Sequence, residues 1–460
     1  MSSKTKNAGR IVKSRKGKGS TPHQKNHRWE SFSTKISKLH SLDPLRKVRR
    51  HDLDVEDLHT TTSYFRNGLE KWADLNISRD FTSFRREVMP LCESLPQILH
   101  FEMKIMEVLA RYISMQEKES LEPLLELLTA FAHDLGARFE KHYRTALGLI
   151  TAIASRPQDS AVIEWTFACL AFMFKYLSKL LVPDLRPTYD AMAPLLGKAR
   201  NPSHIVRFAA EALSFLVRKA AAPANRESAL PRLVEHVRVD LENSRDSKQM
   251  GLYYHGLMTT FAEAIKGHGQ GVHTTGPEIL RALIAAVPDQ EGLALNEMTW
   301  SDLVSGVLVS IVHHTTADTF GPIADVLVDV ASKDGRLTGC PVRNCLYVRL
   351  IGTVSGVRKG NRISDWSPLL KTLQTALNGI SRSRNSLDNI ESSAVWQQLI
   401  VNVAIPWAIA PMDAVIPFIT DLTNIMTREP LMKWFIPFCS YFAELDAVRF
   451  RSLFIKQFQK

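Results

Sequence analysis

The stretch from Ser160 to Ala222 constrains the fold most strongly, because it predicts three successive helices separated by two short turns. The first helix is expected over 161–181, where apolar residues recur at three- and four-residue spacing. Its predicted apolar face consists of Trp165, Cys169, Phe172, Tyr176 and Leu180. Pro183 and Asp184 end this helix, and a shorter second helix is expected to reach about Leu196.

The third helix of this stretch opens at Asn201-Pro202-Ser203 and is rich in small apolar residues. Ala209 and Ala210 allow a neighbouring helix to approach closely, whereas Glu211 is expected to stay in contact with water. Helices of this design cannot bury their apolar surface as a single pair and need another pair on each side. The pattern therefore predicts an all-α fold, an α-solenoid of HEAT/armadillo-like helix pairs.

The rest of the chain from residue 57 onward shows the same helical rhythm, about one pair every 40 residues. We expect one solenoid domain over 57–460 and no sheet. Two insertions are predicted to be loops, at 267–273 and 378–389. Further helices are predicted at 64–76, 80–95, 97–116, 121–135, 139–155, 230–243, 249–266, 277–287, 296–314, 320–332, 341–357, 369–378, 389–410, 412–428, 430–442 and 446–458.

The last predicted helix leaves Phe454, Ile455 and Phe458 exposed, with no polar capping repeat after them. Solenoid ends normally carry such a cap. We therefore expect the natural protein to continue beyond this sequence.

The positive charge of the chain is concentrated at its start. The formal net charge is +11, yet residues 1–50 hold 15 Lys and Arg and only two acids, whereas the remainder holds 43 basic and 45 acidic residues. Residues 1–27 have almost no apolar content and are expected to form a disordered basic tail.

Residues 28–56 are predicted to be an amphipathic docking segment followed by a basic cluster. Trp29, Phe32, Ile36 and Leu39 share one helical face and are the candidate protein-docking residues, either on this chain's own solenoid or on a partner. Residues 1–50 as a whole are expected to bury little surface.

The basic residues of this region are the main functional signal. Lys and Arg spaced by Gly and Ser can follow a phosphate backbone without reading its sequence. A nuclear import signal is the alternative interpretation, and the two roles can coincide. The candidate nucleic-acid-binding residues are Lys13, Arg15, Lys16, Lys18, Lys25, Arg28, Arg46, Lys47, Arg49 and Arg50.

No catalytic signature stands out in the sequence. It lacks a phosphate-binding Gly-rich loop, a dinucleotide fingerprint and a His-Glu-x-x-His motif. The five scattered cysteines do not have zinc-ligand spacing and predict buried thiols in a reducing compartment. We therefore predict a protein that is not an enzyme, with no cofactor, metal, small-molecule substrate or membrane partner.

Several residue groups together resemble one known family. Arg207-Phe208-Ala209-Ala210-Glu211, then Phe215-Leu216 and Arg218-Lys219, look like the most characteristic signature of the down-regulated-in-metastasis protein family. Members are giant HEAT-repeat, U-three small nucleolar RNA-associated components of the small-subunit processome. The further matching residues are Glu164-Trp165, Lys175-Tyr176-Leu177, Gly68-Leu69, Trp72, Leu75-Asn76, Arg28-Trp29 and Phe32.

The resemblance implies an N-terminal portion of a non-catalytic scaffold in the nucleus and nucleolus. It would bind pre-ribosomal RNA, small nucleolar ribonucleoprotein components and other assembly factors during small-subunit rRNA processing and ribosome biogenesis. The alternative is a transport-receptor-like solenoid that binds protein cargo, against which the near-neutral charge after residue 50 argues mildly.

Overall fold

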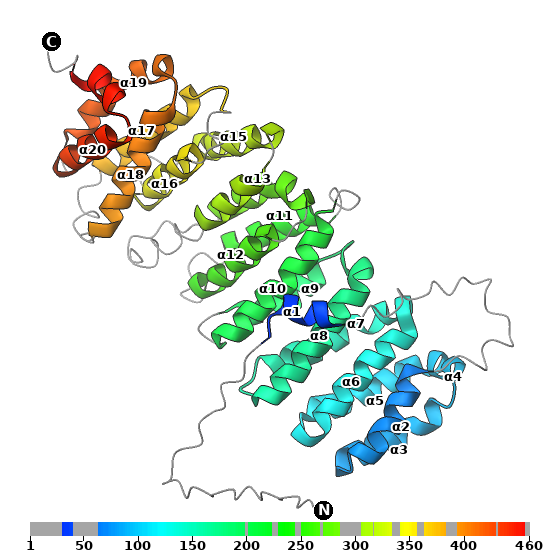
Figure 1. The fold of residues 1–460 in the computed structure, drawn as a ribbon. Helices are drawn as coiled ribbons and strands as arrows, with labels where there is room; N and C mark the ends of the chain where they lie inside the picture. The colour runs from blue at the N-terminus through cyan, green and yellow to red at the C-terminus, as the bar shows by residue number, and fades with distance from the viewer. Residues whose placement is uncertain are drawn as a thin grey trace, which may run out of the picture.

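The structure, a computed structural model, describes residues 30–39, 63–197, 201–222, 229–243, 250–266, 270–285, 305–315, 317–333, 341–356, 363–382, 393–428 and 431–455. Within these ranges the regular secondary structure is helical and no strand occurs. The predicted all-α class is therefore confirmed. Figure 1 shows the helices stacked along one long axis, from α2 at one end to α20 at the other.

The helices form two rows, and most neighbours within each row are in contact. The first row contains α2 (Tyr64–Leu75), α6 (Lys118–Leu135), α8 (Ser160–Leu181), α10 (Ser203–Ala220), α12 (Met250–Lys266), α16 (Pro341–Gly356), α18 (Ser393–Ile409) and α20 (Met432–Leu445). The second row contains α3 (Arg79–Val88), α5 (Glu102–Met115), α7 (Glu140–Ala154), α9 (Arg186–Met192), α11 (Leu230–Asn243), α13 (Gln270–Ala285), α15 (Ala317–Lys333), α17 (Ser367–Arg382) and α19 (Met412–Met426).

Shorter helices connect the two rows or flank them. These are α1 (Phe32–Lys38), α4 (Leu95–His100), the helix Ser305–His314, α21 (Ala447–Phe450), and the 3-10 turns Met89–Leu91, Gly136–Phe139 and Ala193–Leu196. The starts of α6, α8 and α10 lie 42 and 43 residues apart along the chain. This repeat length is typical of HEAT and armadillo units, so the solenoid prediction is confirmed as well.

The central triplet has the predicted boundaries, but α8 faces the core with a different side. Of the predicted face only Cys169 is buried, whereas Trp165, Phe172, Tyr176 and Leu180 remain partly exposed. The side facing the core carries Phe167, Leu170, Phe174 and Leu177. Since α8 is apolar almost all round, three- and four-residue spacing alone could not show which side is covered.

The same composition makes α8 the one described helix long and apolar enough to cross a membrane by length and composition. More than half of that apolar stretch is buried inside the protein, where α8 contacts α6, α7 and α10. Its apolar character is therefore explained by its central place in the stack.

The two predicted loops are only partly outside helices. Helix α13 begins at Gln270, so Gly271 and His273 are helical, and α17 continues to Arg382. Glycine does not exclude a helix here, because it costs only about 1 kcal/mol relative to Ala in a helix interior. Residues 267–269 and 383–392 lie outside the described residues.

The end of the described chain also differs from the prediction. A π-helical turn, Arg451–Ile455, follows α21, and Phe454 is buried against Phe438, Phe442 and Phe450. The wider turn changes the helical phase and directs Phe454 back toward α20. Phe454 is therefore not an exposed residue, as its spacing had suggested. Ile455 is 42% exposed, and Phe458 lies outside the described residues.

The buried cysteines behave as small apolar side chains. Cys92 and Cys169 lie in the core, and burial raises the pKa of the Cys92 thiol to about 11. Burial also raises the pKa of Cys169. These thiols therefore stay protonated at neutral pH and are poor nucleophiles.

Helix α2 begins on a carboxylate of α6. Asp134 accepts hydrogen bonds from the Ser63 hydroxyl at 2.8 Å and from the backbone N–H groups of Tyr64 and Phe65 at 3.0 and 2.8 Å. A helix start leaves four N–H groups without helical partners, and the partly buried Asp134 carboxylate accepts from two of them. The start of α2 is thus hydrogen-bonded to α6, its neighbour in the first row.

Candidate functional site

The predicted nucleic-acid-binding residues and Trp29 lie outside the described residues. The other three predicted docking residues belong to α1 or follow it directly. Phe32 is its first residue, Ile36 lies in its second turn and Leu39 is its C-cap. The candidate functional site described below is the place where α1 contacts the solenoid.

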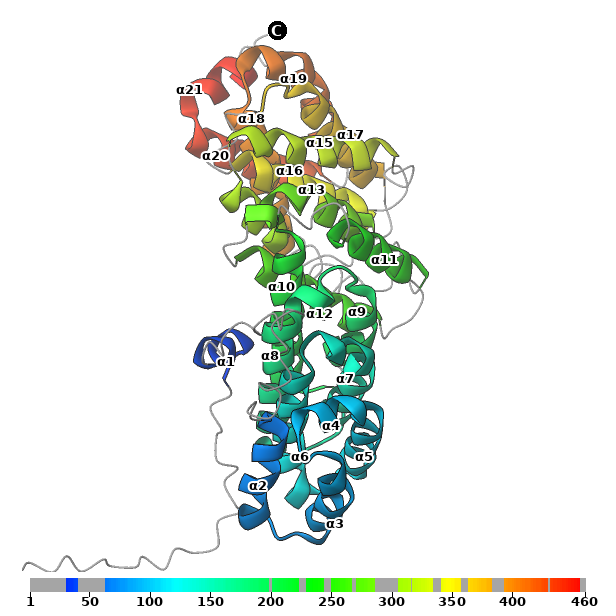
Figure 2. The ribbon, with the colours of Figure 1, turned by 90° about the vertical axis from the view of Figure 1, so that its right-hand side faces the viewer.

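Helix α1 lies across the outer side of α8 and α10, as both ribbon views show (Figures 1 and 2). Its N-cap is Ser31, whose hydroxyl accepts a hydrogen bond from the Thr34 N–H at 3.1 Å. Only seven residues are helical, which is too short for a stable helix in water. Its contacts with α8 and α10 must therefore hold it in shape.

Phe32 provides the apolar contact of α1. Its side chain is fully buried, and its ring lies 6.0 Å from Phe174, 5.4 Å from Phe208 and 5.7 Å from Phe215. The first two ring pairs meet edge to face, the arrangement that aromatic quadrupoles favour. Phe208 in turn stacks on Phe167 of α8, so the pocket is supported by the core.

The backbone ends of α1 are held by two opposite charges from the solenoid. At its start, Glu211 of α10 accepts a hydrogen bond from the Phe32 N–H at 2.8 Å. At its end, the Lys175 ammonium of α8 donates to the carbonyls of Ile36 at 3.0 Å and Leu39 at 2.5 Å. Each charge complements the partial charge of the helix end that it contacts.

A third polar contact involves a side chain of α1. Lys35 is buried and forms an ion pair with Glu164 of α8. The Lys35 side chain is 7% exposed, whereas that of Glu164 is 44% exposed. The buried stem of Lys35 therefore adds packing to the ion pair.

Sequence reasoning missed the three solenoid charges of this site. Glu211 was expected to be exposed to solvent. It is only 5% exposed, and it also accepts a hydrogen bond from Arg207 at 3.0 Å. The available signal was that Glu211, Lys175 and Glu164 all belong to the residue groups that carry the family resemblance. Because α1 is far from them in sequence, spacing could not pair them with it.

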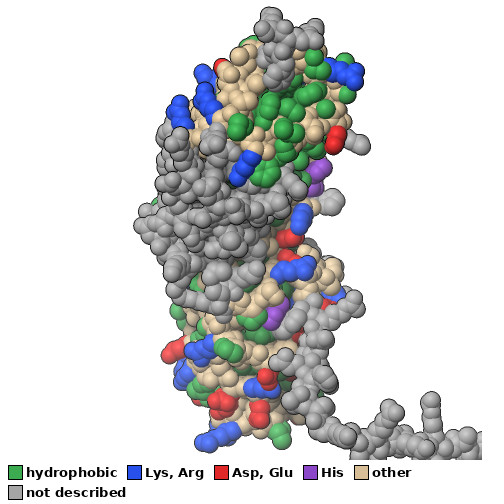
Figure 3. Space-filling view, turned by 90° about the vertical axis from the view of Figure 1, so that its left-hand side faces the viewer, with side chains coloured by type: hydrophobic (Ala, Val, Ile, Leu, Met, Phe, Trp, Pro, Cys, Tyr) green, Lys and Arg blue, Asp and Glu red, His purple; other side chains and the backbone are tan. Residues whose placement is uncertain are grey.

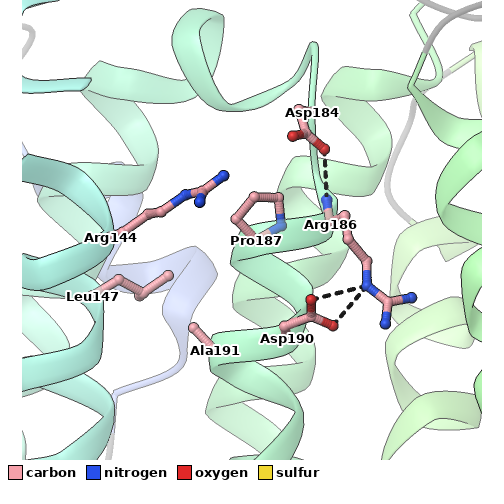
Figure 4. Close-up of a pocket in the computed structure, with 7 residues that line it drawn as sticks. All are labelled: Arg144, Leu147, Asp184, Arg186, Pro187, Asp190 and Ala191. Carbon is pink, nitrogen blue, oxygen red and sulfur yellow. Dashed lines mark hydrogen bonds and ion pairs between the residues drawn. The ribbon is translucent and has the colours of Figure 1, made fainter. Parts of the chain in front are cut away.

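A hollow of about 580 Å³ lies on the other row of helices, between α7 and α9 (Figure 4). Arg144 and Leu147 of α7 line one side, and Asp184 and four residues along α9 line the other. Arg186 pairs with Asp190 at 2.8 Å and with Asp240 of α11 at 3.0 Å. These ion pairs join α9 to α11, which is a structural role.

Apolar side chains are exposed at the C-terminal end of the described chain. They include Ile416, Met432, Ile436 and Val448, and Figure 3 shows hydrophobic side chains gathered toward this end. In the described part of the molecule, no cluster of three or more His, Cys, Asp or Glu side chains could hold a metal ion.

Two rows of paired helices, with starts 42 and 43 residues apart from α6 to α10, carry a short docked helix and define an α-solenoid of the HEAT/armadillo type. The sequence is 32% identical over 440 residues to U3 small nucleolar RNA-associated protein 20 of Schizosaccharomyces pombe. It is also 32% identical over 359 residues to the protein of the same name from Saccharomyces cerevisiae. The family resemblance seen in the sequence is therefore confirmed along 94% of the chain.

These matches cover 94% and 77% of the chain but only 16% and 13% of the two relatives. The chain thus spans about one sixth of the length of the Schizosaccharomyces pombe protein and a smaller share of the Saccharomyces cerevisiae protein. No family model matches it.

Proposed function

We propose that the chain is part of a non-catalytic scaffold of the nucleolar small-subunit processome, acting in rRNA processing and ribosome biogenesis. The observation that carries this proposal is the similarity, along 94% of the chain, to a protein named for its association with U3 small nucleolar RNA. An elongated helical stack supports it, because solenoids present long surfaces to several partners at once.

Within this proposal the basic segment binds pre-ribosomal RNA. Residues 1–50 hold 15 Lys and Arg, whereas the rest of the chain is nearly neutral. RNA contacts are assigned to the ten basic residues from Lys13 to Arg50 named above, through the phosphate backbone. The remaining partners are small nucleolar ribonucleoprotein components and other assembly proteins.

Protein docking is assigned to Trp29, Phe32, Ile36 and Leu39. The packing of Phe32 between α8 and α10 supports a docking role for this segment on the chain's own solenoid. A cargo receptor is less well supported. A receptor for basic cargo is expected to be strongly acidic, whereas the chain after residue 50 holds 43 basic and 45 acidic residues and is nearly neutral.

The test is crosslinking of the tagged full chain to RNA in cells, followed by sequencing of the attached RNA. The proposal expects precursor rRNA of the small subunit and U3 small nucleolar RNA to be enriched. A variant with the ten basic residues changed to Gln should lose most of this RNA. A second variant that exchanges Lys for Arg and Arg for Lys at the same positions should keep it, since the charge is unchanged.

Both variants carry an additional nuclear import signal, so that a loss of RNA is separated from a loss of import. RNA unrelated to ribosome assembly, or unchanged crosslinking after neutralisation, would contradict the proposal.

A further inference from the structure

The α8–α10 surface has the features of a peptide-recognition site. We propose that it recognises short two-turn helices that begin with Phe and carry Lys three residues later, and that α1 is the ligand it holds within the same chain. This proposal is independent of RNA binding and of the role in ribosome assembly.

The recognition groups are supplied by the folded repeats. Phe208 stacks on Phe167 of α8, and Glu211 accepts a hydrogen bond from Arg207 of α10 at 3.0 Å, and neither contact involves α1. Because these side chains are held by α8 and α10 themselves, the pocket is formed largely before α1 arrives. A preformed pocket loses less entropy on binding than one that must be ordered.

Glu211 and Lys175 together select the length of the ligand helix. Glu211 accepts a hydrogen bond from the Phe32 N–H, which has no acceptor within α1, and Lys175 donates to the carbonyls of Ile36 and Leu39. At about 1.5 Å per residue, the seven steps from Phe32 to Leu39 correspond to about 10 Å of helix. A helix of this length places one end on each charge.

Two further contacts select the sequence of the ligand. Phe32 packs in the aromatic pocket, and Lys35, one turn later, forms an ion pair with Glu164. Ser33, Thr34, Ser37 and Lys38 are exposed, so these positions tolerate other residues. The site therefore selects Phe-x-x-Lys in a helical conformation.

The attachment of α1 to the chain explains how so short a helix can occupy the site. Covalent linkage gives a segment an effective concentration of about millimolar, so a weak intrinsic affinity is enough. A separate polypeptide with the same motif then competes with α1 and binds well only when α1 is displaced.

The experiment uses a fluorescent peptide of residues 28–41 and the full chain, with binding followed by anisotropy. The Phe32→Ala chain, whose own α1 no longer fills the pocket, should bind the peptide at least tenfold more tightly than the wild-type chain. A peptide carrying Phe32→Ala should not bind.

Substitutions in the solenoid test the recognition groups. Adding Glu211→Gln or Lys175→Met to the Phe32→Ala chain should weaken peptide binding at least tenfold. Lys179→Met, one turn along α8 at an exposed position, is the matched control and should have no effect. If the Phe32→Ala chain does not fold, Lys35→Glu frees the site instead by opposing Glu164.

Three results would overturn the proposal. They are no binding to either vacated chain at millimolar peptide, equal binding to wild-type and vacated chains, and binding that survives loss of both Glu211 and Lys175.

Discussion

The backbone N–H of Phe32 donates a 2.8 Å hydrogen bond to the Glu211 carboxylate, across 179 positions of sequence. Glu211 is nearly buried, so this bond satisfies a charged group as well as the start of a helix. It joins the N-terminal segment to the centre of the solenoid. The α1 contact is therefore part of the fold.

Phe32→Ala should destabilise the folded chain. Truncating a buried Phe typically costs about 3–5 kcal/mol, but α1 can detach, so we expect a loss of about 1–3 kcal/mol. Urea unfolding followed by circular dichroism measures it. Ser33→Ala, at the exposed neighbouring position, is the control and should change stability by less than about 0.5 kcal/mol. Equal stability of all three chains would show that α1 adds nothing.

This expectation replaces one drawn from sequence, that residues 1–50 bury little surface. Composition averages over the segment and is dominated by its Lys and Arg. A single aromatic residue is enough to reverse the conclusion for α1, since Phe32 fills a pocket between two core helices.

Gly256 should resist substitution because of its contact with the preceding repeat. A Cβ atom there would lie 2.4 Å from the carbonyl oxygen of Leu196, which is backbone and cannot easily move. Gly256→Ala should therefore cost about 1–3 kcal/mol. Gly148 of α7 has no atom within 4 Å of the same position.

Gly148→Ala is thus the matched control, and it should stabilise the chain by about 0.5–1 kcal/mol through helix propensity. Melting temperatures of the two variants should move in opposite directions. A shift in the same direction would mean that the approach of α12 to Leu196 is looser than described.

Glu102 should make stability depend on pH in the acid range. Burial alone would raise the pKa of this carboxyl. Hydrogen bonds and ion pairs with Arg138 and Lys141, both at 3.1 Å, lower it by more, so the pKa lies below its usual value of 4.5. A carboxyl with a lowered pKa in the folded state stabilises the fold at pH values above its usual pKa. This stabilisation is lost as the pH falls through the folded-state pKa.

Glu102→Gln should accordingly cost about 1 kcal/mol at pH 7, since Arg138 and Lys141 are half-exposed and partly screened. The difference from wild type should shrink as the pH falls below about 4.5. Exposed Glu107 on the same helix provides the control, Glu107→Gln. A difference that stays constant from pH 7 to pH 3 would rule out the ion pairs as its source.

RNA binding by the basic segment should be strongly salt-dependent. If about six of its cationic side chains contact phosphates of single-stranded RNA, the slope of log affinity against log salt is about −4. A fourfold rise in salt should then weaken binding by about a few hundredfold, with little dependence on RNA sequence. Filter binding at several salt concentrations measures the slope, and a slope near zero would contradict backbone binding.

The sequence predicted the helices and their stacking well, because apolar spacing and Pro or Gly punctuation are local signals. It correctly placed Ala209 and Ala210 in the core of the stack. It failed for the orientation of α8, whose partly exposed Phe172 and buried Phe174 have the same apolar character. Packing against α6 and α10 decides that orientation, and spacing within one helix holds no information about it.

The candidate site was predictable only in part. The spacing of Phe32, Ile36 and Leu39 indicated a docking helix, and the structure describes α1 at that place. The acceptors could not be assigned, because Glu211 and Lys175 look like ordinary surface charges within their own helices. Their roles follow from meeting the ends of a helix more than 130 positions away.

Hydrogen exchange of the α1 amides in the full chain, followed by mass spectrometry, tests the docked helix most directly. The account predicts that the peptide covering residues 32–38 exchanges at least tenfold more slowly than an unstructured segment. It also predicts that this protection is lost in Glu211→Gln and Lys175→Met and kept in Lys179→Met. Exchange of the wild-type peptide at the rate of an unstructured segment would contradict the docking of α1 on α8 and α10.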